Sequence, residues 1–279
     1  MAAKGEVAVA LTIAGSDSSA GAGAQADLKT LSAFGVYGLT AITCIVAETP
    51  GKVQRIQAVE AELVAEQIAL LLGGFPVRAM KTGMLYSGEI VRRVAQCLRE
   101  GAGGIPLVVD PVMVAKSGDA LLQANAVRSL ATKLLPLALV VTPNIPEAEV
   151  LSKREIRSDQ DARDAARAIA QLGPRFVIVK GGHRGGEPVD VVFDGGNFHE
   201  FAVERVDTEN THGTGCTFSA AITAYLARGF DPIEAIASAK DYLTGALKSS
   251  YVIGDGHSPV NHFHNVRITE PGSLITRRS

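Results

Sequence analysis

Short apolar runs rich in β-branched residues alternate with longer stretches of helical spacing along most of this chain. Five runs have the length of buried strands, at residues 7–14, 40–47, 107–109, 139–142 and 176–179. Three helices are predicted between them, at residues 61–72, 89–99 and 159–171, and Ser158 is a suitable N-cap for the last. This alternation predicts an α/β fold with a mostly parallel central sheet and helices on both faces.

The second half of the chain also contains the pattern of a β-hairpin. Residues 189–193 and 198–203 are joined by Asp194-Gly195-Gly196-Asn197, so we expect an antiparallel margin on the sheet. Glycine and proline are scattered at turns rather than gathered in a linker, and the sequence has no internal repeat. We therefore predict one domain over residues 1–279, with a frayed tail after about residue 269.

Composition and charge exclude several classes of protein. Of the 279 residues, 47% are hydrophobic and the formal net charge is −2, which argues against a nucleic-acid or membrane-surface partner. Cys44, Cys97 and Cys216 are too widely spaced for a zinc site or a disulfide framework, which indicates a reducing compartment. The sequence lacks a run of roughly 20 apolar residues that could span a membrane, and the run at 7–14 has no cleavage site. These features predict a cytoplasmic protein that binds a small molecule, with Cys44 and Cys97 in its core.

Polar, turn-rich sequence follows directly after several predicted strands. These segments are Gly15-Ser16-Asp17, Glu48-Thr49-Pro50, Asp110-Pro111, Pro143-Asn144 and Lys180-Gly181-Gly182. In an open parallel sheet, ligands bind outside the carboxyl ends of the strands. We therefore expect these five strand ends to form the rim of one binding site.

The segment Gly213-Thr214-Gly215-Cys216 precedes a predicted helix at residues 217–228. Such a turn directs backbone N–H groups outward and the helix dipole favours negative charge there, so it is a candidate phosphate cradle without the lysine of a Walker A loop. Cys216 lies at the same helix N-terminus, where the pKa of a thiol is expected to fall. It is a candidate base for an attacking hydroxyl, and a buried structural cysteine fits the turn equally well.

Four further side chains at the rim are candidates for metal or phosphate binding. Glu147 can hold Mg²⁺ through water and Asn144 can position the metal or a phosphate, but an ordinary helix N-terminus is the stronger interpretation of this segment alone. Asp110 can face magnesium or cap the turn before Pro111. Lys180 either brings a cation near the phosphates or ends a strand at the surface.

Two other patterns carry less weight. Residues 21–26 (GAGAQA) match the glycine fingerprint of dinucleotide-binding folds, and Glu48 stands where a ribose ligand is expected. Because residues 16–20 separate these glycines from the strand, a dehydrogenase is a weak alternative. Three histidines near the C-terminus share no predicted face, which favours a solvated turn over a metal site: His257, His262 and His264.

Taken together, the motifs resemble those of the hydroxymethylpyrimidine and phosphomethylpyrimidine kinases of the ribokinase superfamily. The resemblance covers nearly the whole chain, at residues 14–17 (AGSD), 21–30 (GAGAQADLKT), 81–84 (KTGM), 110–113 (DPVM), 143–147 (PNIPE), 180–183 (KGGH), 210–216 (NTHGTGC) and 258–263 (SPVNHF). An ordered series of this kind is more specific than any single motif.

The resemblance implies a ribokinase-like three-layer sandwich, commonly dimeric, that uses ATP and Mg²⁺. It also implies phosphorylation of 4-amino-5-hydroxymethyl-2-methylpyrimidine, and then of its monophosphate to the diphosphate, in thiamine biosynthesis. Carried over residue by residue, the resemblance assigns catalysis to Cys216 as base, with Gly213, Thr214 and Gly215 as anion hole. It implies that the pyrimidine is bound by Asp27, Val46, Glu48, Met84 and Val112. It also implies that Asn144, Lys180 and Thr211 bind the nucleotide and that Asp110 and Glu147 bind the metal.

Two positions depart from the family pattern. Glu48 stands where the family usually has Gln, whose amide can donate to a pyrimidine ring nitrogen and accept from the exocyclic amine. An ionised Glu accepts a hydrogen bond from the amine but repels the lone pair of the ring nitrogen. Three explanations are therefore open: the ring nitrogen is protonated when the ligand binds, the Glu48 carboxyl is protonated, or the ligand is a different molecule. Our hypothesis is that Glu48 binds the aminopyrimidine as its cation. Glu209 stands where Lys is frequent, which weakens an ATP contact there.

Several alternatives remain open at this point. Glu48 leaves room for a pyridoxal-type kinase on the same fold. A non-catalytic pyrimidine- or nucleotide-binding regulator is disfavoured, because the chain keeps Cys216, Asn144, Glu147 and Asp110. The sequence does not determine whether one or both phosphorylations occur. The Gly- and Ser-rich segment at 16–23 is a candidate lid over the substrate.

Overall fold

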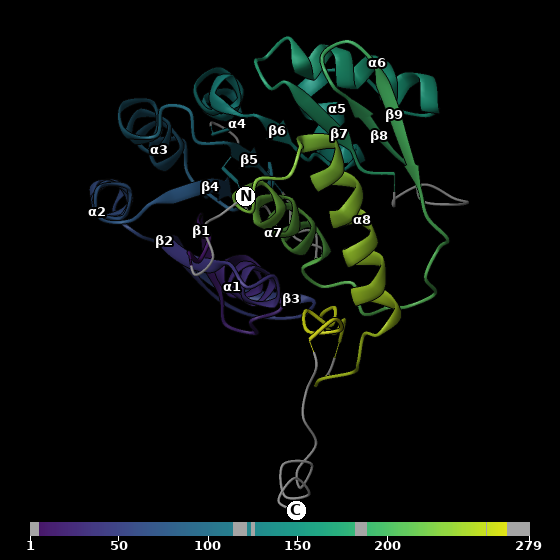
Figure 1. Cartoon of the computed structure of the whole chain (residues 1–279), viewed down its shortest axis with the longest axis horizontal. Coiled ribbons are helices and arrows are strands. Elements are labelled where there is room, and N and C mark those ends of the chain that lie inside the picture. Colours follow the sequence, from purple (N-terminus) through teal and green to yellow (C-terminus); the bar gives the residue numbers. More distant parts are fainter. Residues whose placement is uncertain (1–5, 114–121, 124–125, 182–188, 255, 267–279) are drawn as a thin grey trace, which may run out of the picture.

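The computed structural model describes residues 6–113, 122–123, 126–181, 189–254 and 256–266. The predicted frayed tail after residue 269, and Gly182 and His183 of the 180–183 motif, lie outside these residues. The described chain forms a mixed nine-stranded sheet with helices on both faces (Figure 1). The predicted α/β class and three-layer arrangement are confirmed.

The order of the strands in the sheet is β3-β2-β1-β4-β5-β6-β7-β8-β9. Their bounds are β1 Val9–Asp17, β2 Tyr37–Thr49, β3 Lys52–Ala58, β4 Val77–Thr82, β5 Leu107–Val109, β6 Val140–Val141, β7 Phe176–Val179, β8 Val189–Phe193 and β9 Phe198–Ala202. β1, β2 and β4 to β7 are parallel, whereas β3 pairs antiparallel with β2, and β8 and β9 form an antiparallel hairpin beside β7. The five predicted strands and the hairpin are confirmed, but β3 and β4 were not predicted, and antiparallel margins lie at both edges.

Helices cover the two faces of the sheet in separate groups (Figure 1). One face is covered by α1 (Gly23–Ala33), α7 (Thr214–Ala227) and α8 (Pro232–Lys248). The other is covered by α2 (Ala61–Gly74), α3 (Gly88–Gly101), α4 (Ala126–Ser129), the π-helical η1 (Leu130–Leu134), the 3-10 turn η2 (Leu135–Leu137), α5 (Ile145–Ser152) and α6 (Asp159–Ala170). All four predicted helices are confirmed, and Ser158 caps α6 by accepting a hydrogen bond from the Asp161 N–H. None of the described helices has both the length and the apolar character needed to span a bilayer.

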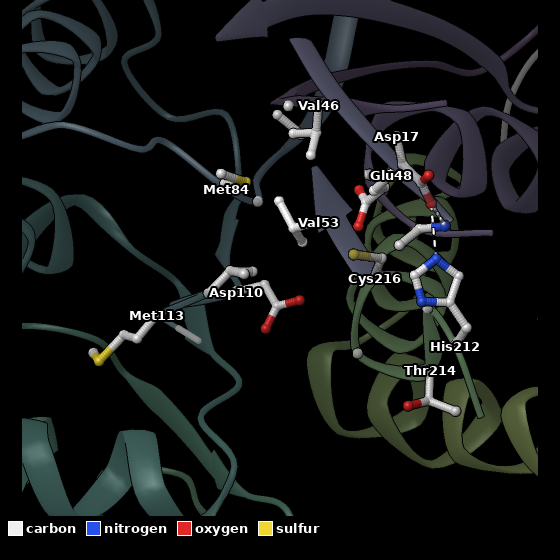
Figure 2. A pocket seen from close by; sticks show the side chains of 18 of the residues that line it. Asp17, Val46, Glu48, Val53, Met84, Asp110, Met113, His212, Thr214 and Cys216 are labelled. Atoms are coloured by element: carbon white, nitrogen blue, oxygen red, sulfur yellow. Dashed lines mark hydrogen bonds and ion pairs between the residues drawn. The ribbon is translucent and has the colours of Figure 1, made fainter. Parts of the chain in front are cut away.

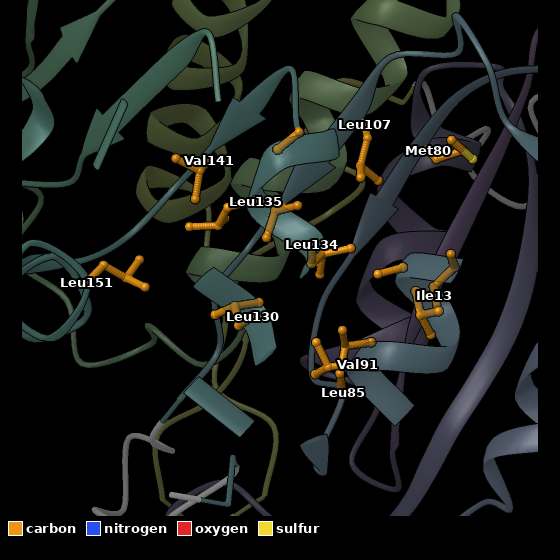
Figure 3. Packing of buried hydrophobic residues seen from close by; sticks show 14 of the residues in the cluster. Ile13, Met80, Leu85, Val91, Leu107, Leu130, Leu134, Leu135, Val141 and Leu151 are labelled. Atoms are coloured by element: carbon orange, nitrogen blue, oxygen red, sulfur yellow. The ribbon is translucent and has the colours of Figure 1, made fainter. Parts of the chain in front are cut away.

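Both faces of the central strands are buried, because alternate side chains of a strand point to opposite helix layers. In β1, Leu11 and Ile13 belong to the cluster that includes α2 and α3, whereas Ala10 belongs to the cluster that includes α1 and α7. Figure 3 shows the first cluster, which combines Ile13 of β1 with Leu107 of β5 and Leu134 of η1. The continuous apolar runs of the sequence are therefore the buried central strands.

The order of the strands reverses on either side of β1. β2 lies on one side of β1 and β4 on the other, which is the switch point beside which ligands bind in open α/β sheets. β2 is long, and its last residues, Ala47 to Thr49, continue beyond the β1 pairing and pair with β3. A two-stranded ribbon therefore stands beside the crevice at the carboxyl ends of the strands.

Candidate active site

A cavity of about 600 Å³ lies at the carboxyl ends of the central strands. Its walls are the ends of β1 and β4, the β2–β3 ribbon, the segments after β5, β6 and β7, and the first turn of α7. The five strand ends predicted to form a rim therefore meet at one cavity. All predicted site residues except Asp27 line it: Val46, Glu48, Met84, Asp110, Val112, Asn144, Glu147, Lys180, Thr211, Gly213, Thr214, Gly215 and Cys216.

One end of the cavity is apolar. Val46 and Met84 are almost fully buried and form a small cluster with Cys44, against which Val53 and Val112 pack. Figure 2 shows Val46, Val53 and Met84 on the same side of the cavity. Because Val53 belongs to β3, the strand missed by the sequence analysis supplies part of this wall. Such a wall suits the face of a flat heterocyclic ring.

Glu48 is the polar group at the apolar end. Its N–H donates to Ser18 Oγ at 2.9 Å, and the Ser18 hydroxyl donates to the Glu48 carbonyl oxygen at 2.6 Å, so the loop after β1 fixes its backbone. Burial raises the pKa of the Glu48 carboxyl to about 7, the charge of Asp17 adds to this, and His212 opposes it. The carboxyl therefore exchanges its proton near neutral pH.

The first turn of α7 forms the floor of the cavity between its two ends. The N-cap residue Gly213 has a φ of 75°, and a Cβ there would collide with the carbonyl oxygen of Gly21. A Cβ at Gly215 would lie 3.5 Å from both Asp110 Oδ2 and Lys180 Nζ, so this turn faces that pair directly. Within the described residues no side chain caps α7, which leaves its N-terminus directed at the cavity, as a phosphate cradle requires.

Cys216 corrects one of our expectations. The thiol points into the cavity between Glu48 and Asp110 (Figure 2). Burial raises its pKa to about 12, Lys81 opposes this, and the negative charges of Asp27 and Asp110 add to it. The predicted lowering of the pKa by the helix N-terminus is therefore wrong, because burial and two carboxylates outweigh the helix dipole.

Asp27 lies behind the cavity rather than in its wall. Its side chain is 0% exposed, and its carboxylate accepts hydrogen bonds from Lys81 Nζ at 2.6 Å and Thr12 Oγ1 at 2.6 Å. Asp27 therefore does not line the cavity, and its contact with the pyrimidine stays a prediction. Lys81, which the sequence analysis did not single out, is the other fully buried member of this ion pair. The nearby negative charges outweigh burial and raise the pKa of Lys81, so this lysine is a fixed positive charge behind the cavity.

Asp110 is the buried carboxylate of the polar end. It is 3% exposed and lies 3.4 Å from Lys180 Nζ. Its oxygens accept hydrogen bonds from Thr142 Oγ1 at 3.2 Å and from Ser219 Oγ at 3.3 Å. Lys180 is therefore not a simple surface strand end, since its ammonium group pairs with Asp110 at the cavity.

Asn144 and Glu147 form a capping box at the start of α5. Asn144 Oδ1 accepts from the Glu147 N–H at 3.0 Å, and Glu147 Oε2 accepts from the Asn144 N–H at 2.9 Å. The helix-cap interpretation of this segment is confirmed. Both residues nevertheless line the cavity, and burial together with Asp110 raises the pKa of Glu147 against the effect of Lys180.

The polar end has the chemistry of a magnesium site that is completed by a ligand. Asp110 and Glu147 supply the hard carboxylate oxygens that Mg²⁺ prefers. Among the residues that the structure describes, no group of three or more His, Cys, Asp or Glu side chains is arranged to hold a metal. Mg²⁺ is commonly bound through one or two carboxylates plus substrate phosphates, so these residues fit a metal that arrives with a nucleotide.

The sequence analysis also missed a contact between Asp17 and His212. His212 Nε2 lies 2.8 Å from Asp17 Oδ2, and the dashed line in Figure 2 marks this contact. Both residues line the cavity beside Glu48. Each lies within a motif of the family resemblance, but 195 positions separate them, so no local pattern could have paired them. Asp17 also accepts hydrogen bonds from the N–H groups of Ser19 and Ala22, so the Asp17 carboxylate holds the backbone of the candidate lid at 16–23 in place.

One of the three C-terminal histidines, His262, differs from the predicted solvated turn. His262 is 1% exposed and its Nε2 lies 3.1 Å from Thr217 Oγ1 on α7. Burial, with smaller effects of Lys29 and His212, lowers its pKa to about 4, so its ring is neutral. The expectation of a solvated turn is wrong for His262, because the C-terminal segment packs behind the first turns of α7. His257 is exposed and His264 is partly buried.

Residues 17–261 match the family model described as phosphomethylpyrimidine kinase. The chain is 48% identical over 261 residues to the hydroxymethylpyrimidine/phosphomethylpyrimidine kinase of Rhizobium meliloti. This match covers 92% of this chain and 97% of that protein. It is also 48% identical over 254 residues to the thiamine biosynthesis bifunctional protein ThiED of Geobacter sulfurreducens. That match covers 90% of this chain and 51% of the relative, so this chain spans about half of the bifunctional protein.

A solved structure shows the same fold. The pyridoxal kinase of Staphylococcus aureus, in complex with AMP-PCP and pyridoxal, superposes on this chain with a TM-score of 0.86 at 37% sequence identity. The superposition covers 95% of this chain and 96% of that protein. That protein therefore holds an ATP analogue and a hydroxymethyl heterocycle together on this fold.

Proposed function

Because the chain belongs to the phosphomethylpyrimidine kinase family, we propose that it phosphorylates 4-amino-5-hydroxymethyl-2-methylpyrimidine with ATP, and then phosphorylates the monophosphate to the diphosphate, in thiamine biosynthesis. The chain is a kinase, so the regulator and dehydrogenase alternatives are set aside. One observation supports the assignment most strongly. A single cavity combines an apolar wall, a thiol at a helix N-terminus and a carboxylate–lysine pair.

We assign the pyrimidine to the apolar end of the cavity. Val46, Met84 and Val112 would pack against the ring, and the Glu48 carboxyl would meet its amino group and the adjacent ring nitrogen. Since the pKa of Glu48 is raised to about 7, one proton is readily shared between the carboxyl and the ring nitrogen. Whether that proton is written on the acid or on the ring, the bound pair has the same net charge. This supports binding of the substrate with one added proton.

We assign the nucleotide to the polar end. Asn144, Lys180 and Thr211 would contact the nucleotide, and Asp110 and Glu147 would hold Mg²⁺. When bound, the metal supplies positive charge that neutralises the phosphates. Lys180 already stands beside Asp110 at 3.4 Å and adds a fixed positive charge at the same place.

We assign the transfer step to the first turn of α7. The substrate hydroxyl oxygen bonds to the γ-phosphorus as the bond from that phosphorus to the bridging oxygen breaks, and ADP leaves with that oxygen. Backbone N–H groups of Gly213 to Cys216 would stabilise the charge that spreads over the transferring group, which is typically worth a few kcal/mol for each donor. Placement and charge neutralisation therefore carry most of the catalysis.

Cys216 would accept the hydroxyl proton. Its pKa of about 12 keeps the thiol protonated at neutral pH, so it would give this proton to solvent before it accepts the proton of the hydroxyl. Because phosphoryl transfer passes through a loose transition state, the hydroxyl needs little activation, and a base that acts late is sufficient. Lys81, buried behind the cavity, favours the thiolate.

The family resemblance also supports three proposals about the whole protein. We propose that the chain acts as one kinase domain, that it forms a homodimer and that it works in the cytoplasm. The nine-stranded sheet that runs through the described residues supports the first of these. Sedimentation velocity at several protein concentrations measures the second, and a monomer throughout would contradict it.

The experiment that tests the proposed function offers the hydroxymethyl aminopyrimidine and pyridoxal side by side with ATP and Mg²⁺. We expect mono- and diphosphate products from the pyrimidine, resolved by anion-exchange chromatography, and loss of both when Mg²⁺ is chelated. Pyridoxal is included because the Staphylococcus aureus structure binds it on the same fold. A clear preference for pyridoxal would reject the pyrimidine assignment while keeping the kinase.

A further inference from the structure

Two turns that are far apart in the chain interlock beside the cavity. One is the loop after β1 (residues 17–22) and the other leads into α7 (residues 211–214). A Cβ at Gly21 would collide with the ring of His212, and a Cβ at Gly213 would collide with the carbonyl oxygen of Gly21. Only glycine at these two positions allows the turns to approach so closely.

Asp17 organises the first of these turns. Its carboxylate accepts hydrogen bonds from the N–H groups of Ser19 and Ala22, both at 2.7 Å, and lies 2.8 Å from His212 Nε2. These bonds outweigh the effect of burial and lower the pKa of Asp17 to about 2, so the group is a carboxylate at neutral pH. The turn includes Ala20 at a φ of 59°, a conformation that costs energy for a residue with a Cβ. A strained loop of this kind persists because its partners hold it.

The second turn is fixed from two sides. The side chain of His212 meets Asp17, and its backbone N–H donates to the carbonyl oxygen of Ser258 at 3.3 Å. The next residue, Gly213, is the N-cap of α7, and the proposed phosphate cradle and Cys216 follow within one turn. Any displacement of His212 therefore shifts the first turn of α7.

We propose that the Asp17–His212 contact is a latch that sets the phosphate-binding turn of α7 at a fixed position relative to the pyrimidine end of the cavity, so that both residues are positioning residues for phosphoryl transfer.

The loop after β1 connects the latch to the substrate. Ser18, next to Asp17, holds the backbone of Glu48 through two hydrogen bonds at 2.6 and 2.9 Å. The loop thus contacts the proposed pyrimidine residue on one side and His212 on the other. The latch therefore controls how far Cys216 and the cradle lie from the hydroxymethyl group. A misplacement of reacting groups by about 1 Å can reduce turnover on the order of a hundredfold.

The first test is His212→Phe, which keeps an aromatic ring against Gly21 and removes the ring nitrogens. A second His–Asp pair provides a matched control, since His199 Nε2 lies 2.8 Å from Asp194 Oδ2 in the β8–β9 hairpin. Two quantities are measured: kcat and KM for both substrates, and the rate at which iodoacetamide alkylates Cys216 in the protein without ligands, followed by mass spectrometry.

We expect His212→Phe to lower kcat by about tenfold to a hundredfold, with a smaller change in the KM for ATP and a severalfold faster alkylation of Cys216. His199→Phe should change neither kcat nor alkylation. His212→Gln, which restores a donor to Asp17, should recover much of the lost turnover and slow alkylation again. Asp17→Asn should resemble His212→Phe, and combining the two should add little further loss.

Three results would overturn the latch. Turnover and alkylation of His212→Phe that match the wild type would show that the contact positions nothing. Lower turnover with unchanged alkylation would mean that His212 acts by touching a substrate. Loss of folding in both His212→Phe and Asp17→Asn would assign the pair to stability alone. The proposal rests on the proposed function for its kinetic test only, because alkylation is measured without substrate and remains decisive if the wild type fails to phosphorylate the pyrimidine.

Discussion

The carboxyl groups at the two ends of the cavity differ in the hydrogen bonds and ion pairs that hold them. At the polar end, Asp110 lies 3.4 Å from Lys180 Nζ and Glu147 is held in the capping box of α5. At the apolar end, the Glu48 carboxylate accepts no hydrogen bond from any described residue, although its backbone is tied to Ser18. Burial raises the pKa of both glutamates. They therefore share a cause of perturbation and differ in how firmly they are held.

This difference indicates how each end recognises its ligand. Asp110 is paired with Lys180 and accepts a hydrogen bond from Thr142, so it presents an ion pair at a fixed position, which suits a nucleotide and its cation. The pKa of Glu147 and that of Glu48 are both raised to about 7, but the Glu147 carboxyl is held by the capping box, whereas the half-buried Glu48 carboxyl has no such partner among the described residues and can adjust its position and its protonation to the ligand. The polar end is thus preorganised for phosphate chemistry. The apolar end favours a heterocycle that can share a proton with the Glu48 carboxyl.

The largest effect is expected at Cys216, where the two ends meet. Cys216→Ala should lower kcat by roughly two to four orders of magnitude, because it removes the proposed proton acceptor. ATP affinity, measured by isothermal titration calorimetry, should stay nearly unchanged because the polar end keeps Asp110, Glu147 and Lys180. Cys97→Ala is the matched control, since Cys97 lies on α3 away from the cavity. Wild-type turnover in Cys216→Ala would refute the base and would leave placement as the source of catalysis.

A smaller effect separates the two ends by pH. If the pyrimidine binds with one added proton, its affinity for the wild type should fall about tenfold for each pH unit above about 7, where both Glu48 and the free ligand have lost that proton. Glu48→Gln donates a hydrogen bond at any pH, so its affinity should be nearly constant over the same range. Binding is measured by calorimetry between pH 6.5 and 9.

The exposed Glu66 on α2 provides the control for this pH series. Glu66→Gln should keep the wild-type slope, because Glu66 is not among the residues that line the cavity. Equal slopes in the wild type and in Glu48→Gln would reject proton-coupled binding and would make Glu48 a plain hydrogen-bond acceptor.

The sequence predicted the parts of the fold whose signals are local. Central strands such as β7 are continuous apolar runs because they are buried on both faces. Ser158 indicates the start of α6, because it forms the capping box of this helix. β3 was missed because it is a largely exposed edge strand, and β4 because Arg78 and Lys81 interrupt its apolar pattern. α8 could have been found, since Asp231 caps it and Pro232 follows. α1 lacks such a cap and was overlooked.

The candidate site was predictable as a set of strand ends, but not as a network of charges. The topology rule brings Asp110, Asn144 and Lys180 to one rim whatever their partners are. The buried Lys81–Asp27 pair joins residues 54 positions apart, and no spacing rule connects them. The pKa expected for Cys216 was overturned by burial, to which Asp27 and Asp110 add and which Lys81 opposes. A local rule about helix N-termini is reliable only when the burial and the neighbouring charges of the group are known.

The smallest effect compares two capping boxes, one at the cavity and one away from it. Asn144→Ala and Ser158→Ala each remove the side-chain acceptor of a helix start, which should cost about 1 kcal/mol of the free energy of unfolding and lower Tm by a few degrees. The two variants should therefore be equally destabilised in thermal scans. Only Asn144→Ala should also raise the KM for ATP, because Asn144 lines the cavity and Ser158 does not. If both variants kept the wild-type KM, Asn144 would be a helix cap alone, and the polar end would recognise the nucleotide through Asp110, Glu147 and Lys180 without it.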